Sequence, residues 1–145
     1  MTVRSLTSAL LMLVIGVSVA SAEEPVPIRF VLSNPPAYQA HAPLIQGKVS
    51  AVRSQGGAKV GDCYYHDTYT FTLDDDTAAI SVIAPAGPCT TPGAPRVPLA
   101  APVSDGEMVS LRAHILVLVE NDPLHPKVMA KALPADILRI EDTTR

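Results

Sequence analysis

Alternation of apolar and polar residues with a period of two is the feature that most constrains the fold of this chain. The clearest example is residues 64–73, where aromatic and aliphatic side chains alternate with histidine and threonine. A strand places successive side chains on opposite faces of a sheet, so such a stretch is typical of a half-buried strand. The 14 prolines lie between the alternating stretches, where they disfavour long helices. The sequence therefore predicts an all-β domain.

The stretch at residues 64–73 has two distinct faces. The face expected to join the core carries Tyr65, Tyr69, Phe71 and Leu73. The opposite, polar face carries Tyr64, His66, Thr68, Thr70 and Thr72. Periodicity alone is enough to explain the apolar face as core and the polar face as solvent-exposed. The alternative is that one of the two faces is a binding strip.

Further stretches with the same period place the other strands. We expect strands at residues 44–54, 78–84 and 108–120, and a last strand or strand pair at 127–133 and 137–140. Gln55, Gly56 and Gly57 are expected to end the first strand. Residues 74–77 predict a hairpin turn, because short acidic side chains accept hydrogen bonds from nearby backbone amides.

Two segments are rich in proline. Residues 23–43 hold five prolines, so we expect an extended lead-in with at most one edge strand. Residues 85–106 hold six, which predicts a long surface loop that is either a lid or a tether.

The N-terminus is typical of a cleavable signal peptide spanning residues 1–22. Arg4 precedes an apolar core, and Ala20 and Ala22 precede two glutamates. A membrane anchor is the alternative, but it needs about 20 apolar residues, and this core is shorter. The mature chain would be a periplasmic or secreted domain with no membrane span. It would carry ten basic against fourteen acidic residues once Arg4 is removed, which gives no electrostatic reason to expect a polyanionic partner.

The two cysteines, Cys63 and Cys89, are expected to form a disulfide. If residues 74–77 are the turn, Cys63 faces residue 88 across the hairpin, within the distance that a disulfide spans. An oxidising compartment favours a structural bridge over a redox or metal-binding pair, and the spacing is not C-x-x-C.

Several short motifs resemble the OB-fold superfamily. The second strand ends in Phe71, Leu73, Asp74, Asp75 and Thr77, and Gly106, Glu107 and Val109 introduce the fourth. Asp76 and Ala78 stand where that family usually has glycines. The resemblance covers residues 44–141 and is greatest to small bacterial members exported to the periplasm. It implies a five-stranded Greek-key barrel, with the proline-rich loop in place of the usual helix between strands three and four. An immunoglobulin-like sandwich is the competing fold, but the strands are too few.

The resemblance also implies a binding face on strands two and three. The candidate ligand-binding residues are Tyr64, His66, Thr68, Thr70, Lys48 and Arg112. Single-stranded nucleic acid could stack on this strip, but that needs a positive groove, and export and acidity disfavour it.

A metal site would have to assemble in space, because no histidine motif is present. His66 and His114 could meet if their strands pair. No catalytic motif or cofactor fingerprint occurs, so an enzyme is the least supported class. We therefore expect a non-catalytic exported binding or stress-associated module without a cofactor. Its ligand, whether small molecule, cation, peptide or envelope protein, and its oligomeric state are not determined by the sequence.

Overall fold

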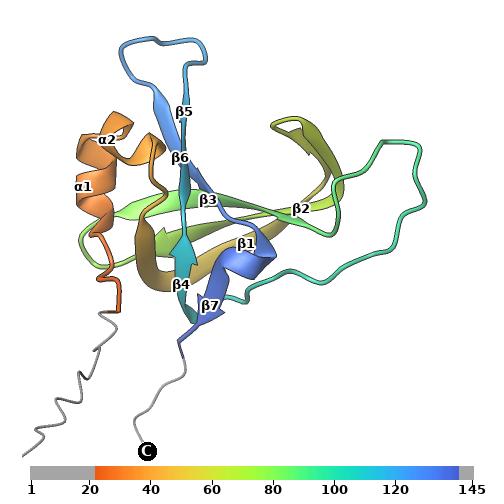
Figure 1. Cartoon of the computed structure of the whole chain (residues 1–145), viewed down its shortest axis with the longest axis horizontal. Helices are drawn as coiled ribbons and strands as arrows, with labels where there is room; N and C mark the ends of the chain where they lie inside the picture. The colour runs from red at the N-terminus through yellow and green to blue at the C-terminus, as the bar shows by residue number, and fades with distance from the viewer. Residues whose placement is uncertain (1–21, 141–145) are drawn as a thin grey trace, which may run out of the picture.

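The computed structural model describes residues 22–140, so almost all of the expected signal peptide lies outside the described residues. The elements are α1 (Ile28–Ser33), α2 (Pro36–Gln39), β1 (Leu44–Val60), β2 (Cys63–Asp74), β3 (Ala79–Ala86), β4 (Met108–Arg112), β5 (His114–Leu118), β6 (Lys127–Lys131), the 3₁₀ helix η1 (Pro134–Asp136) and β7 (Ile137–Arg139) (Figure 1). Within this part of the chain, no helix has the length and apolar character needed to cross a bilayer.

The strands form one mixed sheet in the order β5-β6-β3-β2-β1-β4-β7. Only β3 and β6 run parallel, and the other neighbours are antiparallel. The predominantly β architecture is confirmed, but the expected count of five strands is corrected to seven within residues 22–140. The predicted strand at residues 108–120 is divided at Ala113, whose amide donates to the carbonyl of Pro43 (2.9 Å). The last pair is separated by η1, which begins at Pro134.

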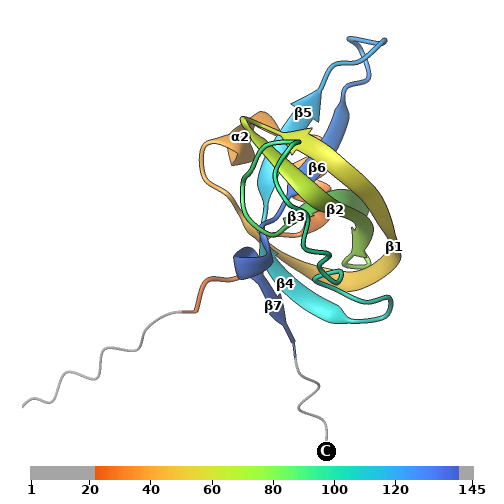
Figure 2. The same cartoon turned by 90° about the vertical axis from the view of Figure 1, so that its right-hand side faces the viewer.

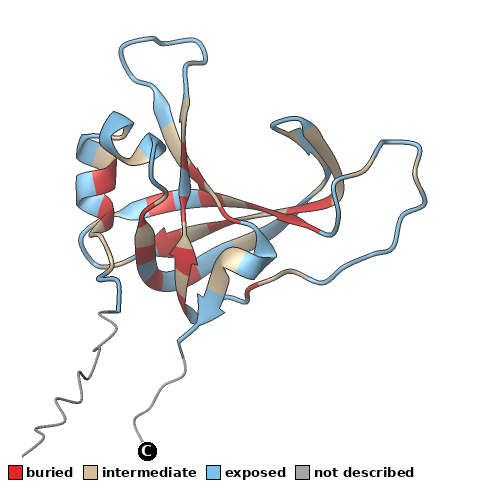
Figure 3. Cartoon of the chain, in the orientation of Figure 1, coloured by how far each residue is buried: buried red, intermediate tan, exposed pale blue. Residues whose placement is uncertain are grey.

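The core lies in the middle of the sheet, where the buried residues are concentrated (Figure 3). Ile45, Leu73, Val82 and Leu111 are fully buried, and each comes from a different strand. Phe71 and Leu73 therefore occupy the core face that the alternation predicted, whereas Tyr65 and Tyr69 are only half-buried. Burial of apolar area is the main force that holds such an arrangement together.

The expectation of an extended lead-in is wrong, because residues 28–39 contain two short helices. Proline is tolerated at the start of a helix, where its missing amide proton would have no partner. Pro27 and Pro35 are the N-cap residues, and Pro36 is the first residue of α2. Ile28 and Val31, three positions apart, are both fully buried against the core. Tertiary packing thus stabilises a helix that is too short to be stable in isolation.

Strand β1 continues through the glycines that were expected to end it. It runs to Val60 because residues 54–60 remain paired with β2. The register shifts between Ser50 and Arg53, between Ser54 and Gly56, and between Gly56 and Ala58. Bulges of this kind bend a strand and increase its twist, and Figure 2 shows the long β1–β2 hairpin curling.

The hairpin turn after β2 is confirmed, and Asp75 organises it. One carboxylate oxygen accepts hydrogen bonds from the amides of Thr77 (2.9 Å) and Ala78 (3.1 Å) and from the Thr77 hydroxyl (2.6 Å). The other accepts from the amide of Ile28 at the start of α1 (2.8 Å). Partial burial raises the pKa of Asp75, but these hydrogen bonds together lower it below its ordinary value.

We expect Asp75→Asn to lower the free energy of unfolding by roughly 1 to 2 kcal/mol, because hydrogen bonds to a charged acceptor are stronger than those to a neutral one. A lowered folded pKa means that this contribution is complete above about pH 4 and is lost as the pH falls through the folded value. Urea unfolding of both proteins between pH 7 and pH 2 should show the difference shrink below about pH 4. The control is Asp76→Asn, because the Asp76 carboxylate accepts no hydrogen bond from residues 22–140. A difference that is independent of pH would contradict this role.

The disulfide between Cys63 and Cys89 is confirmed, with the two Cα atoms 5.1 Å apart. The hairpin register differs slightly from the expectation. Asp74 pairs with Ala79, and an isolated bridge joins Tyr64 to Thr90 rather than Cys63 to residue 88. Residues 87–107, here called the proline-rich loop, contain no helix and no strand apart from that bridge. The expected loop is therefore confirmed, but its start is corrected from residue 85 to residue 87. Pro85 and Ala86 still pair with β2 at the end of β3.

Candidate functional site

A groove of about 650 Å³ lies on the outer face of β1, β2, β3 and β6. Hydroxyl side chains from β2 and β3 line it, namely Thr68, Thr70, Thr72 and Ser81. Curled β1 contributes Ala51, Arg53, Gln55 and Ala58, and β6 contributes Lys127 and Met129. Ile83 supplies further apolar surface, and Phe71, which belongs to the core, borders the groove with almost no exposed area. A concave surface with an apolar base and a few polar groups is typical of ligand sites.

Thr68 is the most informative residue in this groove. Its side chain is fully buried, and its hydroxyl oxygen has no hydrogen-bond partner among residues 22–140. Its cross-strand partner is Pro85 on β3, which has no amide proton to donate. A buried hydroxyl without a partner costs about 1 to 3 kcal/mol, and such groups in native proteins are few. The structure thus holds an unused polar group beneath the groove.

The groove is positively charged. Arg53 and Lys127 line it, no aspartate or glutamate does, and neither basic side chain has an ion-pair partner in the described structure. Gln55 donates from its side-chain nitrogen to the Thr70 hydroxyl (3.0 Å), which places the amide over the threonine row. The electrostatics favour an anionic ligand and disfavour a free cation.

A bulge in β1 shapes one wall of the groove. Ala51 has a positive φ of 54°, a conformation that costs a residue with a side chain about 1 to 2 kcal/mol. The amide of Val52, freed from the ladder by the bulge, donates to the Asp105 carboxylate (3.0 Å). Strained backbone of this kind clusters at functional sites. Here it turns Arg53 toward the same groove as Thr70, its cross-strand partner.

The structure brings two of the predicted ligand residues together in the groove. Thr68 and Thr70 share the groove, whereas His66 lines a separate cavity beneath the proline-rich loop. Tyr64 lies edge-on to the His66 ring, with ring centroids 5.3 Å apart. Lys48 lies at the far end of the β1–β2 ladder, opposite Asp74.

Arg112 is the last residue of β4, and its side chain binds other parts of the chain. Its guanidinium donates to both carboxylate oxygens of Glu23 (2.8 and 2.5 Å) and to the carbonyl of Ala42 (3.2 Å). These hydrogen bonds lower the pKa of Glu23. The arrangement ties the start of the described chain to the sheet and leaves the guanidinium occupied.

The pairing that the metal alternative required is absent from the sheet. β3 and β6 separate β2, which carries His66, from β5, which carries His114. The nearest acidic partner of His114 is Asp136, 3.9 Å away on η1. Among residues 22–140 no three potential ligands cluster closely enough to hold a metal ion.

Sequence reasoning missed three residues of the groove as ligand candidates: Arg53, Gln55 and Lys127. Arg53 lies in the predicted strand at residues 44–54 and was not among the ligand candidates. Gln55 was assigned to the end of a strand that in fact continues, and Lys127 lies on β6, whose parallel pairing with β3 joins residues far apart in the chain. The available signal was the absence of acidic residues among residues 44–60.

Comparison with known proteins gives a fold and no family. No protein-family model matches the chain, and no curated protein matches it. Among solved structures it is similar to the crystal structure of a putative aspartyl-tRNA synthetase from Leishmania major Friedlin, with a TM-score of 0.53 and 13% sequence identity. The match covers 90% of this chain but only 23% of that one. At this identity the likeness establishes a shared fold alone.

Proposed function

We propose that this chain is an exported, non-catalytic binding module with an OB-like barrel, and that it binds an anionic ligand in the groove over β2 and β3. The observation that carries the proposal is the buried, unpartnered Thr68 hydroxyl in a groove whose charged residues are Arg53 and Lys127. A ligand oxygen would give the hydroxyl its missing partner, and the two cations would balance the charge.

The strand order supports the barrel. β4 and β5 follow one another with only Ala113 between them. Taken as one bent strand, they pair with β1 at one end and with β6 at the other. The strands then pair in the order β1, β2, β3 and β6, and the bent β4–β5 strand joins β6 back to β1. The contact between β3 and β6 is parallel. We propose that these five strands close into the barrel that the sequence resembles, with β7 as an added edge strand.

Export is supported by the disulfide and by the N-terminal pattern. Disulfides persist mainly in oxidising compartments, and the Cys63–Cys89 bridge joins the two ends of a long segment. We propose a periplasmic or secreted location on these two grounds.

Thr68→Val tests the role of the hydroxyl, because valine has nearly the same shape and no polar group. We expect this variant to be more stable than the wild type by about 1 kcal/mol, since it removes an unsatisfied buried group. It should also bind a short acidic peptide, hexaglutamate, several-fold more weakly in an NMR titration of the mature chain. Thr72→Val, on the same strand face, is the control and should not gain stability. A destabilised Thr68→Val would show that the hydroxyl is already satisfied in solution.

Charge reversal tests the groove itself. Arg53→Glu combined with Lys127→Glu should abolish hexaglutamate binding, whereas Lys48→Glu combined with Lys59→Glu should retain it, because neither of these lysines lines the groove. Equal losses from the two pairs would contradict a localised site.

Single-stranded nucleic acid is the second candidate, and the same positive groove favours it. Two cations in contact with phosphates would make log K fall with log salt with a slope of roughly −1.4 for a single strand. Suppose that an oligothymidine binds more tightly than hexaglutamate, shows this slope, and no longer binds the Arg53→Glu, Lys127→Glu variant. The groove would then be a site for nucleic acid rather than for an acidic peptide.

A further inference from the structure

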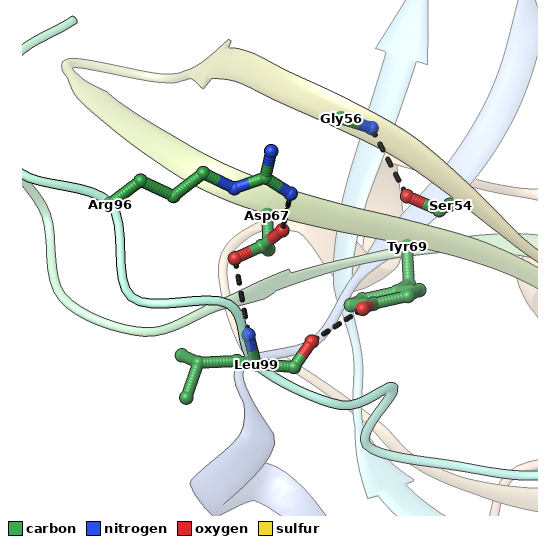
Figure 4. A network of polar contacts seen from close by, with 6 residues as sticks. All are labelled: Ser54, Gly56, Asp67, Tyr69, Arg96 and Leu99. Atoms are coloured by element: carbon green, nitrogen blue, oxygen red, sulfur yellow. Dashed lines mark hydrogen bonds and ion pairs between the residues drawn. The ribbon is translucent and has the colours of Figure 1, made fainter.

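The proline-rich loop is held firmly against the first half of β2. The disulfide fixes Cys89 to the start of the strand, and the amide of Thr90 donates to the carbonyl of Tyr64 (2.9 Å). Further along, the buried carboxylate of Asp67 binds Arg96 (2.7 Å) and accepts from the amide of Leu99 (3.3 Å) (Figure 4). The Tyr69 hydroxyl donates to the carbonyl of Leu99 (2.5 Å).

The start of the loop, at Gly87, also contacts a later part of the loop, at Leu99. Gly87 has a positive φ of 82°, and a side chain there would lie 2.8 Å from the Leu99 side chain. The positive φ favours glycine at this position, and the flexible end of the Leu99 side chain contacts it. Together with the anchors on β2, this makes the loop a fixed wall.

Between this wall and β2 lies a cavity of about 270 Å³, separate from the groove. It is lined by His66, Pro88, Thr90, Pro95, Val97 and Leu99. The lining is largely apolar, and no aspartate, glutamate, lysine or arginine contributes to it. Prolines supply two of the six residues, and their fixed φ keeps the shape of the wall.

The polar side chains that line this cavity are those of Thr90 and His66. The His66 imidazole is the more informative of the two. Its Nε2 atom is buried and has no hydrogen-bond partner within the described chain. The edge-on ring of Tyr64 (interplanar angle 87°) packs against the imidazole and restricts its orientation. Leaving a buried nitrogen unpaired is unfavourable, so the cavity holds a polar atom in need of a partner.

We infer that this cavity is a second binding site, for a small uncharged ring-sized molecule that bears one hydroxyl or N–H group. The group pairs with His66 Nε2, and the ring contacts Val97, Leu99 and the prolines. The size supports the class, since an apolar cavity of about 150 Å³ holds benzene, and this one has room for a ring with a substituent. The absence of a charged lining residue disfavours an ionic ligand, because burying an unpaired charge is costly.

Phenol and toluene form the matched pair of probes, because they share a ring and differ in the hydroxyl. In NMR titrations of the mature, disulfide-bonded chain, phenol should shift the amide signals of His66, Thr90 and Leu99 saturably. It should bind about tenfold more tightly than toluene, which is the effect of one hydrogen bond of about 1.4 kcal/mol. Equal affinities, or no saturable shift with either probe, would overturn the inference.

Two variants locate the site. His66→Phe should lower phenol affinity about tenfold and leave toluene affinity unchanged, so that phenol loses its advantage. Val97→Trp should block both probes by filling the cavity mouth, and it threatens the fold little because Val97 is 72% exposed. The control, Leu124→Trp, changes a residue that is 84% exposed and outside the cavity. Unchanged phenol binding in His66→Phe, or equal effects of the two tryptophans, would disprove the assignment. The groove charge reversal should leave phenol binding intact, which separates this site from the proposed anion site.

Discussion

Replacing Gly47 by alanine is expected to lower the free energy of unfolding by about 3 kcal/mol, at the upper end of the cost of overpacking a core. Gly47 is buried on β1 where that strand crosses the end of β2. A Cβ atom there would lie 2.5 Å from the carbonyl oxygen of Asp74 and 2.8 Å from its carbonyl carbon. Both are backbone atoms, so no side-chain rotation relieves the contact. The strands would have to separate next to the turn that Asp75 organises.

Chemical denaturation of Gly47→Ala and of Gly93→Ala provides the comparison. Gly93 lies in the proline-rich loop, and a Cβ there meets no atom within 4 Å. The Gly93 variant should therefore be as stable as the wild type or slightly more stable, because alanine restricts the unfolded chain. If Gly47→Ala were as stable as Gly93→Ala, β1 and β2 would not approach one another as closely at Gly47 as the structure shows.

Removing the disulfide is the second change with a large expected effect. The bridge joins residues 26 positions apart, and closing a loop of that length restricts the unfolded chain by about 3 kcal/mol in the chain-entropy account. The double variant Cys63→Ala and Cys89→Ala should lose that much stability. It should also become sensitive to proteases within residues 88–103, because the disulfide is one of the anchors of the loop. Native-state proteolysis followed by mass spectrometry would locate the cleavage.

Reduction of the wild type is the control for side-chain loss at the two positions. Dithiothreitol should reproduce both the lost stability and the new cleavage, since it breaks the same bond without substitution. Retention of full stability by the reduced protein would show that the remaining anchors, Asp67 with Arg96 and Tyr69 with Leu99, are sufficient to hold the loop.

The candidate sites were predictable only in part. Thr68 and Thr70 were identified because alternation assigns them to the polar face of β2, and that face became the groove. Their different burial was not predictable, because alternation assigns both to the same face and says nothing of the neighbouring strands with which each one pairs. His66 was identified as well, but the cavity it lines is formed by a loop whose path the prolines do not specify. Arg112 and Lys48 have the right charge, yet they lie outside the groove lining.

Local patterns in the sequence determined the strands of the hairpin, its turn, the disulfide and the absence of a helix from residues 87–107. Each of these features depends on neighbours along the chain or on the register of one hairpin. Alternation with a period of two specifies its strands, and the row of aspartates specifies its turn. The tertiary structure alone decided the helix at residues 28–33, the break at Ala113, the length of β1, and the meeting of Arg53, Thr68 and Lys127. These features arise from packing and pairing between segments far apart in the chain, and the energy of such contacts outweighs the weak local preferences that a sequence pattern reports.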